Sequence, residues 1–193
     1  MTTEPTLVLL RADDLPWRSM TIPDSNLDVE LTRLHLDPRT RANVALVRFP
    51  AGWARPGVGH YDCAEQFVVL DGGLEVSGVR FGEGEFGYLP ARTVRAASGV
   101  APGGCLAVAW FSGPPRWSVG PPASPPVEEV LHGRVGHPPG DVGGGACGLD
   151  GTPTGPVDSI TELLWPELGG WCVLPAGALS PRLPGPVVLR RWQ

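Results

Sequence analysis

Three ionisable side chains, held in two glycine-bounded stretches, are the strongest candidates for chemistry in this chain. His60 and Glu65 lie in the stretch Gly52–Gly73, and Arg95 lies in the stretch Gly84–Gly99. An imidazole and a carboxylate can exchange protons with a substrate near neutral pH. A guanidinium offers a permanent positive charge and planar hydrogen-bond donors to a carboxylate or carbonyl oxygen. These residue types suit an acid–base site for a small anionic or carbonyl-bearing molecule.

The same two stretches resemble the paired motifs of the cupin superfamily, which are written G-x5-H-x-H-x3,4-E-x6-G and G-x5-P-x-G-x2-H-x3-N. Glu65 and Gly72 keep the E-x6-G spacing of the first motif, and Gly84 and Pro90 keep the G-x5-P spacing of the second. His60 stands at the second histidine position of the first motif. The resemblance implies a small antiparallel barrel whose interior holds one ligand.

Two of the four metal-ligand positions that the resemblance implies hold residues of another kind. Val58 stands at the first histidine position, and Arg95 stands at the histidine position of the second motif. His60 and Glu65 alone supply two ligands, fewer than the three protein ligands of typical catalytic zinc sites. Arg95 would also repel a cation at close range. We therefore expect no metal and no cofactor. A residual metal site would need His35, Asp62, Tyr61 or Cys63 to join His60 and Glu65, and His35 is the first choice.

In a cupin the motif glutamate points into the barrel, so the resemblance places Glu65 there together with His60 and Arg95. Strand alternation then sends Phe67 and Val69 inward beside Glu65. A buried carboxylate and a buried guanidinium offset each other, whereas either alone is costly to bury. We expect the Arg95 guanidinium to occupy the space of the metal, with His60 and Glu65 as the acid–base pair. The alternative is a buried Glu65–Arg95 ion pair that only stabilises the barrel.

Two tryptophans are further candidates for the ligand site. Trp53 follows the first glycine of the first motif, and Trp110 stands near the end of an apolar run. Rings of this size near a barrel mouth could stack on a planar ligand, beside Phe67 and Val69. The alternative is that both tryptophans fill the core.

The fold alone does not choose among the activities found on cupin barrels. The lost ligand positions weigh against iron chemistry, which needs an open metal site with a histidine–carboxylate set. The site residues favour a metal-independent isomerase, cyclase or lyase of small-molecule metabolism, secondary metabolism included. A non-catalytic ligand-binding or sensor barrel is the first alternative, and a metal-dependent enzyme with a reduced ligand set is the second.

Short strands separated by turn signals are predicted over the first part of the chain. The segment 27–36 alternates apolar and polar residues, which predicts a half-buried strand. Asn43–Phe49 is the next predicted strand, and Glu65–Leu70 follows the first motif histidine. Short strands at this spacing indicate an all-β sandwich or barrel. The resemblance selects the cupin-type jelly-roll barrel, over residues 17–117.

Beyond residue 117 the composition changes. Residues 118–157 are rich in proline and glycine, which predicts a long loop. Residues 158–193 predict an extension that packs on the barrel or on a second subunit of a homodimer. Within it, Ser159–Glu162 is a capping box that predicts a short helix ended by Pro166, with short strands beyond. The stretch VLPAGALSPRLPG echoes VRFPAGWARPGVG, so a degenerate second cupin repeat is the alternative.

Composition excludes several other classes of partner. Charged residues make up 18% of the chain and the net charge is −5, which argues against nucleic-acid binding. No apolar run approaches the roughly 20 residues that span a bilayer, and the N-terminus lacks the pattern of a signal peptide, so a cytoplasmic location is expected. All 15 basic residues are arginine, a bias typical of GC-rich bacterial genomes. The four cysteines lie far apart, which predicts reduced thiols and no disulfide framework.

Overall fold

The protein is described by a computed structural model over residues 6–127, 129–135, 146–149 and 153–191. The chain divides into two compact units, one of Pro16–His132 and one of Met1–Leu15 with Gly133–Gln193. Both units are built from strands, and no residue in the described ranges is helical. Accordingly, no helix in these ranges is long and apolar enough to cross a membrane. The all-β prediction is confirmed.

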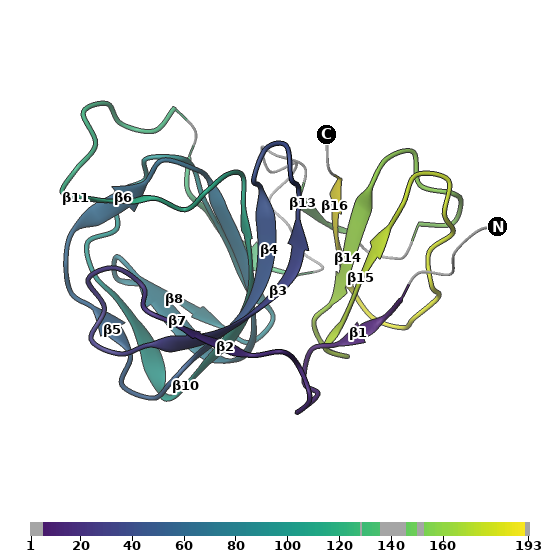
Figure 1. Cartoon of the computed structure of the whole chain (residues 1–193), viewed down its shortest axis with the longest axis horizontal. Coiled ribbons are helices and arrows are strands. Elements are labelled where there is room, and N and C mark those ends of the chain that lie inside the picture. The colour runs from purple at the N-terminus through teal and green to yellow at the C-terminus, as the bar shows by residue number, and fades with distance from the viewer. Residues whose placement is uncertain (1–5, 128, 136–145, 150–152, 192–193) are drawn as a thin grey trace. The chain divides into compact units, whose positions relative to one another are not determined.

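The unit of residues 16–132 is a barrel, drawn on the left of Figure 1. Its strands are β2 (Arg18–Met20), β3 (Val29–Leu36), β4 (Asn43–Phe49), β5 (Ala54–Arg55), β6 (Gly59–Tyr61), β7 (Glu65–Val76), β8 (Val79–Gly82), β9 (Glu85–Leu89), β10 (Ser98–Phe111), β11 (Trp117–Val119) and β12 (Leu131–Arg134). The larger sheet has the order β12-β9-β7-β10-β4-β3-β2, with β5 beside β10 and β8 beside β7. A smaller sheet pairs β11 with β6.

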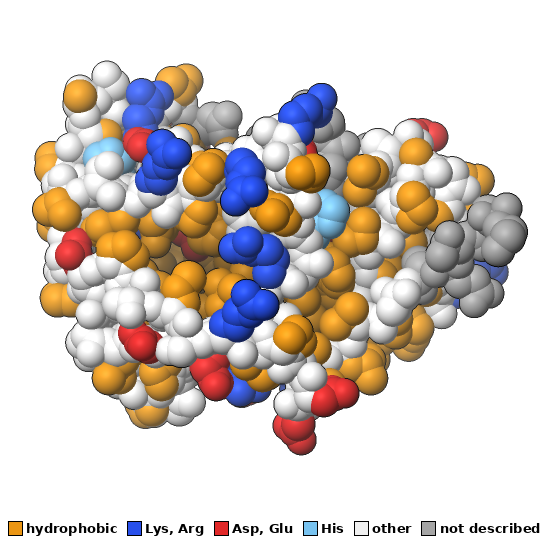
Figure 2. Space-filling view, viewed as in Figure 1, with side chains coloured by type: hydrophobic (Ala, Val, Ile, Leu, Met, Phe, Trp, Pro, Cys, Tyr) orange, Lys and Arg blue, Asp and Glu red, His pale blue; other side chains and the backbone are white. Residues whose placement is uncertain are grey.

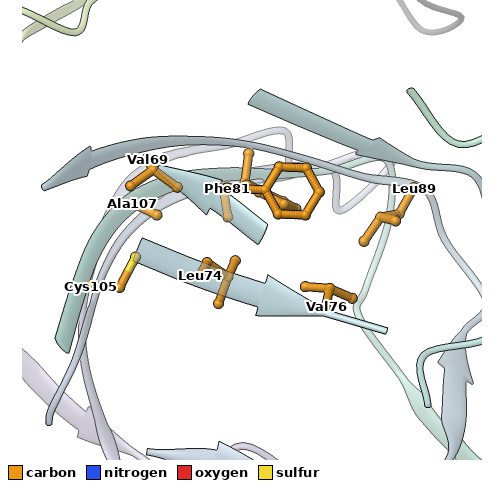
Figure 3. Packing of buried hydrophobic residues seen from close by; sticks show 9 residues of the cluster. Val69, Leu74, Val76, Phe81, Leu89, Cys105 and Ala107 are labelled. Atoms are coloured by element: carbon orange, nitrogen blue, oxygen red, sulfur yellow. The ribbon is translucent and has the colours of Figure 1, made fainter. Parts of the chain in front are cut away.

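The two longest strands, β7 and β10, lie at the centre of the larger sheet. One face of each strand points into the barrel. Ala107 lies opposite Val69, and Ala109 lies opposite Phe67. Directly opposed residues share a face of the sheet, so small alanines on β10 face larger side chains on β7. The buried inner cluster comprises Phe67, Val69, Leu74, Val76, Phe81, Leu89, Cys105, Ala107 and Ala109, and its side chains converge between the strands in Figure 3.

The motif glycine Gly72 has a steric reason to be glycine. Its φ is +72°, a conformation that side chains other than glycine rarely adopt. A Cβ atom at this position would lie 2.2 Å from the carbonyl oxygen of Gly104. The register of β7 and β10 shifts between Val100 and Cys105, next to this contact. The glycine therefore allows the two central strands to remain close at an irregularity.

The second unit holds a five-stranded antiparallel sheet that includes the N-terminal strand. Its order is β1-β15-β14-β16-β13. The strands are β1 (Val8–Leu9), β13 (Ala146–Leu149), β14 (Thr161–Trp165), β15 (Gly170–Leu174) and β16 (Val187–Arg191). The unit has its own apolar core, formed by Val157, Leu163, Trp165, Cys172, Leu174, Val187 and Leu189.

The short helix predicted after Ser159 is wrong, because this segment forms the strand β14. β14 pairs with β15 on one side and with β16 on the other, which occupies its backbone groups. All five of its residues are buried, whereas an amphipathic surface helix would bury one face only. Thr161 and Trp165 also favour strands. The local capping signal of Ser159–Glu162 is thus overridden by tertiary pairing.

The proline- and glycine-rich segment after residue 117 contributes strands on both sides of its undescribed part. β11 begins at Trp117, and β12 extends the larger barrel sheet beyond β9. β13 pairs with β16 in the second unit. The segment is therefore a source of edge strands as well as loop.

Candidate functional site

Glu65 and Arg95 form a buried ion pair in the barrel. The Nη2 atom of Arg95 lies 2.8 Å from the Oε2 atom of Glu65, and their side chains are 1% and 17% exposed. Glu65 opens β7 opposite Phe111, two residues before Phe67, so it points to the inner face. Arg95 is held by two backbone hydrogen bonds with Gly59, of 3.0 and 2.8 Å. The contact expected between Glu65 and Arg95 is confirmed.

Tyr61 joins this pair and links it to a second buried arginine. The guanidinium carbon of Arg95 lies 4.6 Å from the centre of the Tyr61 ring. The Nη1 atom of Arg55 donates a hydrogen bond of 3.0 Å to the phenol oxygen of Tyr61. Burial raises the pKa of Tyr61, and the charge of Glu65 raises it further. The phenol is therefore protonated at physiological pH and keeps its own hydrogen to donate.

Arg55 is packed between aromatic rings and is 5% exposed. Its guanidinium carbon lies 3.9 Å from the centre of the Trp117 ring. It stands on β5 opposite Ser98 of β10, on the inner side of the barrel. The indole Nε1 atom of Trp117 donates a 2.6 Å hydrogen bond to Asp24, which fixes the ring over the guanidinium. Gly59 leaves room for this ring, since a Cβ atom there would lie 2.2 Å from it.

The motif predicts that His60 points towards the ion pair, but the structure places its side chain elsewhere. Gly59 lies opposite Arg95, so Tyr61, two residues on, shares the face of Arg95 and His60 points to the other face of β6. The Nδ1 atom of His60 lies 3.0 Å from the carbonyl oxygen of Gly120. The histidine thus holds the chain after β11, and Tyr61 takes the place that His60 was expected to fill.

The four predicted lining residues separate into two groups. Phe67 and Val69 belong to the inner cluster beside Glu65. Trp53 is buried in a neighbouring apolar cluster and makes an edge contact with Phe49, at 4.8 Å between ring centres. Trp110 lies opposite Gln66 on β7 and therefore on the face away from Glu65. The register thus places Trp110 away from the ion pair.

The residues at the motif positions do not fit a metal ion. Val58 is 44% exposed, and the guanidinium of Arg95 occupies the side of Glu65 where a cation would bind. Within the described ranges no three histidine, cysteine, aspartate or glutamate side chains are placed to hold one ion. His35, half-buried on β3 next to a register shift, does not join His60 and Glu65 in such a group. We derive no metal chemistry from this arrangement.

Only one of the two buried arginines at the site forms a salt bridge within the described residues. Arg55 and Arg95 are both buried, and the salt bridge to Glu65 belongs to Arg95. The Nε atoms of both arginines are buried and have no hydrogen-bond partner among the described residues. Figure 2 shows a hollow in the face of the barrel turned to the viewer, with hydrophobic side chains around it and a row of basic side chains beside it. The arrangement can hold a small anion next to apolar groups.

Arg55 and Trp117 were not predicted as site residues, and Tyr61 was considered only as a ligand of a residual metal site. Arg55 lies among the five variable residues of the first motif, and Tyr61 is the neighbour of the motif histidine. Two arginines and one tyrosine at or close to degenerate motif positions were the available signal, whereas Trp117 lies outside both motifs. Their convergence depends on the facing of β5, β6 and β11, which the motif spacing does not specify.

The strand order and the inner site define a jelly-roll barrel of the cupin class. Residues 6–110, more than half of the chain, match the ChrR cupin-like domain family. The chain belongs to this family. No curated protein matches the sequence significantly.

Solved structures of similar fold cover nearly the whole chain. A protein from Nostoc punctiforme, proposed to be a dioxygenase, matches with a TM-score of 0.71 and 12% identity, over 97% of this chain and 82% of that one. The E. coli protein Ylba matches with a TM-score of 0.51 and 13% identity, over 97% and 86%. A proposed glyoxylate-induced protein from Pseudomonas aeruginosa matches with a TM-score of 0.51 and 11% identity, over 90% and 83%. At these identities the likeness shows the fold alone.

Proposed function

We propose that the barrel binds a small anionic or carbonyl-bearing metabolite and catalyses a metal-independent reaction of the isomerase, cyclase or lyase type. One observation carries the proposal: Arg95 contacts both Glu65, at 2.8 Å, and the Tyr61 ring, at 4.6 Å, inside the barrel. A carboxylate, a phenol and a fixed cation in a buried site are the groups that formation of an enolate needs.

Each group has an atom left for the ligand. Oε2 of Glu65 accepts a hydrogen bond from Arg95, which leaves Oε1 to take a proton from the carbon next to a carbonyl group. The phenol of Tyr61 accepts from Arg55 and can donate its hydrogen to the enolate oxygen as negative charge develops there. The charge of Arg95 stabilises the same oxygen. Return of the proton from Glu65 to another carbon gives an isomer, and loss of a leaving group gives elimination.

The test separates Tyr61 and Glu65 from His60. Carboxylate- and carbonyl-bearing metabolites are first screened by thermal shift, and each hit is then followed for turnover by NMR. Tyr61→Phe and Glu65→Gln should lower turnover by roughly 10²–10⁴-fold and should change affinity by only a few fold. His60→Asn is the matched control, because the ring contacts a backbone carbonyl on the other face of β6; it should retain most of the turnover.

Two outcomes contradict this proposal. A screen in which only neutral hydrocarbons stabilise the fold would remove the role of Arg95 as an anchor. Loss of turnover in His60→Asn as large as in Tyr61→Phe would return His60 to the role of base.

A non-catalytic ligand-binding or sensor barrel is the second candidate function. It is favoured by the contacts that already occupy the polar groups, since Glu65 is paired with Arg95 and Tyr61 accepts from Arg55. A binder can keep these contacts when its ligand is bound, whereas in an enzyme Glu65 must still act as a base while it is paired with Arg95. Ligands that bind and are recovered unchanged after long incubation would favour the binder.

A further inference from the structure

Arg55 is a buried cation without a carboxylate partner among the described residues. It is 5% exposed, and its contacts are the Tyr61 phenol oxygen at 3.0 Å and the Trp117 ring at 3.9 Å. Its Nε atom is buried and makes no hydrogen bond to a described residue. An unpaired charge in a protein interior is strongly unfavourable. A group of opposite charge is therefore expected beside it in the working protein.

The neighbouring polar groups do not supply that charge. Glu65 is paired with Arg95 at 2.8 Å. Tyr61 is a phenol, which is neutral near pH 7. Asp24 accepts from the indole nitrogen of Trp117 at 2.6 Å, and among the described residues no salt bridge joins it to Arg55. Of the two buried guanidinium groups, Arg95 thus has a carboxylate in direct contact, and Arg55 has none.

Two exposed arginines on the core-bearing face of the larger sheet are suited to attract an anion. Arg33 on β3 lies opposite Ala45 on β4. Arg18 on β2 lies opposite Leu31 on β3. Leu31 in turn lies opposite Val47 on β4. Ala45 and Val47 are buried in the core cluster beside Trp53, so both arginines stand on the face of the sheet that carries this core. Arg18 and Arg33 are exposed. Exposed basic side chains on one face of a protein raise the local concentration of small anions.

We infer that the site takes a small monocarboxylate with a second oxygen function close to the carboxylate, as in an oxo or hydroxy acid. The carboxylate binds the Arg55 guanidinium, whose Nε atom has no hydrogen-bond partner among the described residues, and the second oxygen lies at Arg95 and Tyr61. The inference rests on the proposed function and names its substrate class. Both guanidiniums contact the same phenol, so the two oxygen functions of the ligand must be only a few bonds apart.

The charge and the surroundings decide the class of anion. One negative charge matches the one guanidinium that lacks a carboxylate contact, whereas a phosphate dianion would bring a second negative charge into the buried site. The planar fork of arginine suits a carboxylate. The rest of the ligand would face Phe67, Leu89 and the Phe111 ring, which lies 5.9 Å from that of Tyr61. A short apolar chain or ring beyond the oxo acid therefore fits better than a second charged group.

The experiment uses the full chain and named probes. Thermal unfolding is followed in sodium pyruvate, sodium acetate, sodium phosphate and acetamide, each against sodium chloride at equal ionic strength. Wild type should be stabilised most by pyruvate, then by acetate, and less by phosphate or acetamide. Arg55→Met should lose the carboxylate effect, with pyruvate affinity lower by roughly 10–100-fold, the loss expected for charge-assisted hydrogen bonds. Arg55→Lys keeps the positive charge, so its pyruvate affinity should fall by less than that of Arg55→Met.

Two controls keep the result specific. Arg80→Met removes a guanidinium that is 88% exposed and paired with Glu75, and it should respond to pyruvate as wild type does. Arg55→Met should also unfold at the same or a higher temperature than wild type in chloride alone, because it removes an unpaired buried charge. The inference is overturned if phosphate or acetamide stabilises wild type as much as pyruvate, if no probe exceeds chloride, or if Arg55→Met keeps the full pyruvate effect.

Failure of the carboxylate assignment can be distinguished from failure of the proposed catalysis. If neutral carbonyl compounds are bound and turned over as well as carboxylates, catalysis stands and the carboxylate assignment fails. If pyruvate binds through Arg55 but no oxo acid is turned over, the carboxylate assignment stands and catalysis fails.

Discussion

At the scale of single residues, the site is organised by two buried guanidinium groups that use one phenol in different ways. Arg95 lies over the Tyr61 ring, while Arg55 donates to its oxygen. Contact with the ring face is attractive because of the negative charge of the π-electrons. The hydrogen bond orients the phenol so that its own hydrogen is available. Tyr61 therefore connects the Glu65–Arg95 pair with the cation that has no carboxylate partner.

The Glu65–Arg95 pair should show strong coupling in a double-mutant cycle. Glu65→Gln alone leaves the Arg95 charge buried and unpaired, a loss of about 3–5 kcal/mol for a fully buried pair and less here because Glu65 is 17% exposed. Arg95→Met with Glu65→Gln removes both charges at similar volume, so much of that free energy of unfolding should return. Denaturant unfolding measures all four proteins. Equal midpoints for wild type and both single variants would show a wet, open site.

At the scale of elements, the short sheet of β6 and β11 positions the site. Trp117 lies opposite Tyr61, and Ser118 lies opposite His60. This register puts both aromatic rings on the side of Arg55 and Arg95. The bond from His60 to Gly120 holds the end of β11 from the other side. A three-residue strand pair thus decides which side chains enter the barrel.

Gly59→Ala should disturb the packing of β11 on β6. Its Cβ atom would lie 2.2 Å from the Trp117 ring and 2.6 Å from the carbonyl oxygen of Ser118, so β11 must shift. We expect a loss of about 1–3 kcal/mol in the free energy of unfolding, as for other overpacked positions, and a weaker response to pyruvate. Gly103→Ala is the control, because nothing lies within 4 Å of its Cβ position. Tryptophan fluorescence and thermal unfolding report both effects; an unchanged Gly59→Ala protein would contradict this packing.

At the scale of the whole molecule, each unit has its own apolar core, and both cores contain buried thiols. Cys105 lies in the inner barrel cluster, and Cys172 lies in the core of the second unit. Burial raises the pKa of Cys63 to about 11, that of Cys105 to about 12 and that of Cys172 to about 12. The thiolate is the reactive form of cysteine. These three thiols are therefore structural groups rather than nucleophiles at neutral pH.

The native protein should react very slowly with a thiol reagent such as DTNB at pH 8. A Cys147→Ser background isolates Cys63, Cys105 and Cys172, which should react fully once the chain is unfolded in guanidinium. These pKa values exceed the ordinary value of 9.0, so the unfolded chain loses its thiol protons first. The associated stability is complete below about pH 9 and falls as pH rises towards 11–12. Rapid reaction of the native protein would contradict the burial of these thiols.

The sequence by itself determined the class of fold and one contact of the site. Alternation and turn residues in segments such as Asn43–Phe49 are local signals, and they predicted strands correctly. The spacing of Glu65 to Gly72 also reflects a local constraint, since the glycine must allow a close approach of two strands. The motif positions of Glu65 and Arg95 then sufficed to predict their contact.

Only the tertiary structure decided which neighbours complete the site. On a strand, a shift of one residue reverses the facing of every side chain, and the bridge between Gly59 and Arg95 selected Tyr61 over His60. Arg55 enters the barrel because of its pairing with Ser98, a residue far along the chain. The segment 161–165 became a strand for the same reason: two neighbouring strands occupy its backbone groups. Pairing between distant segments supplies free energy that local residue preferences do not encode.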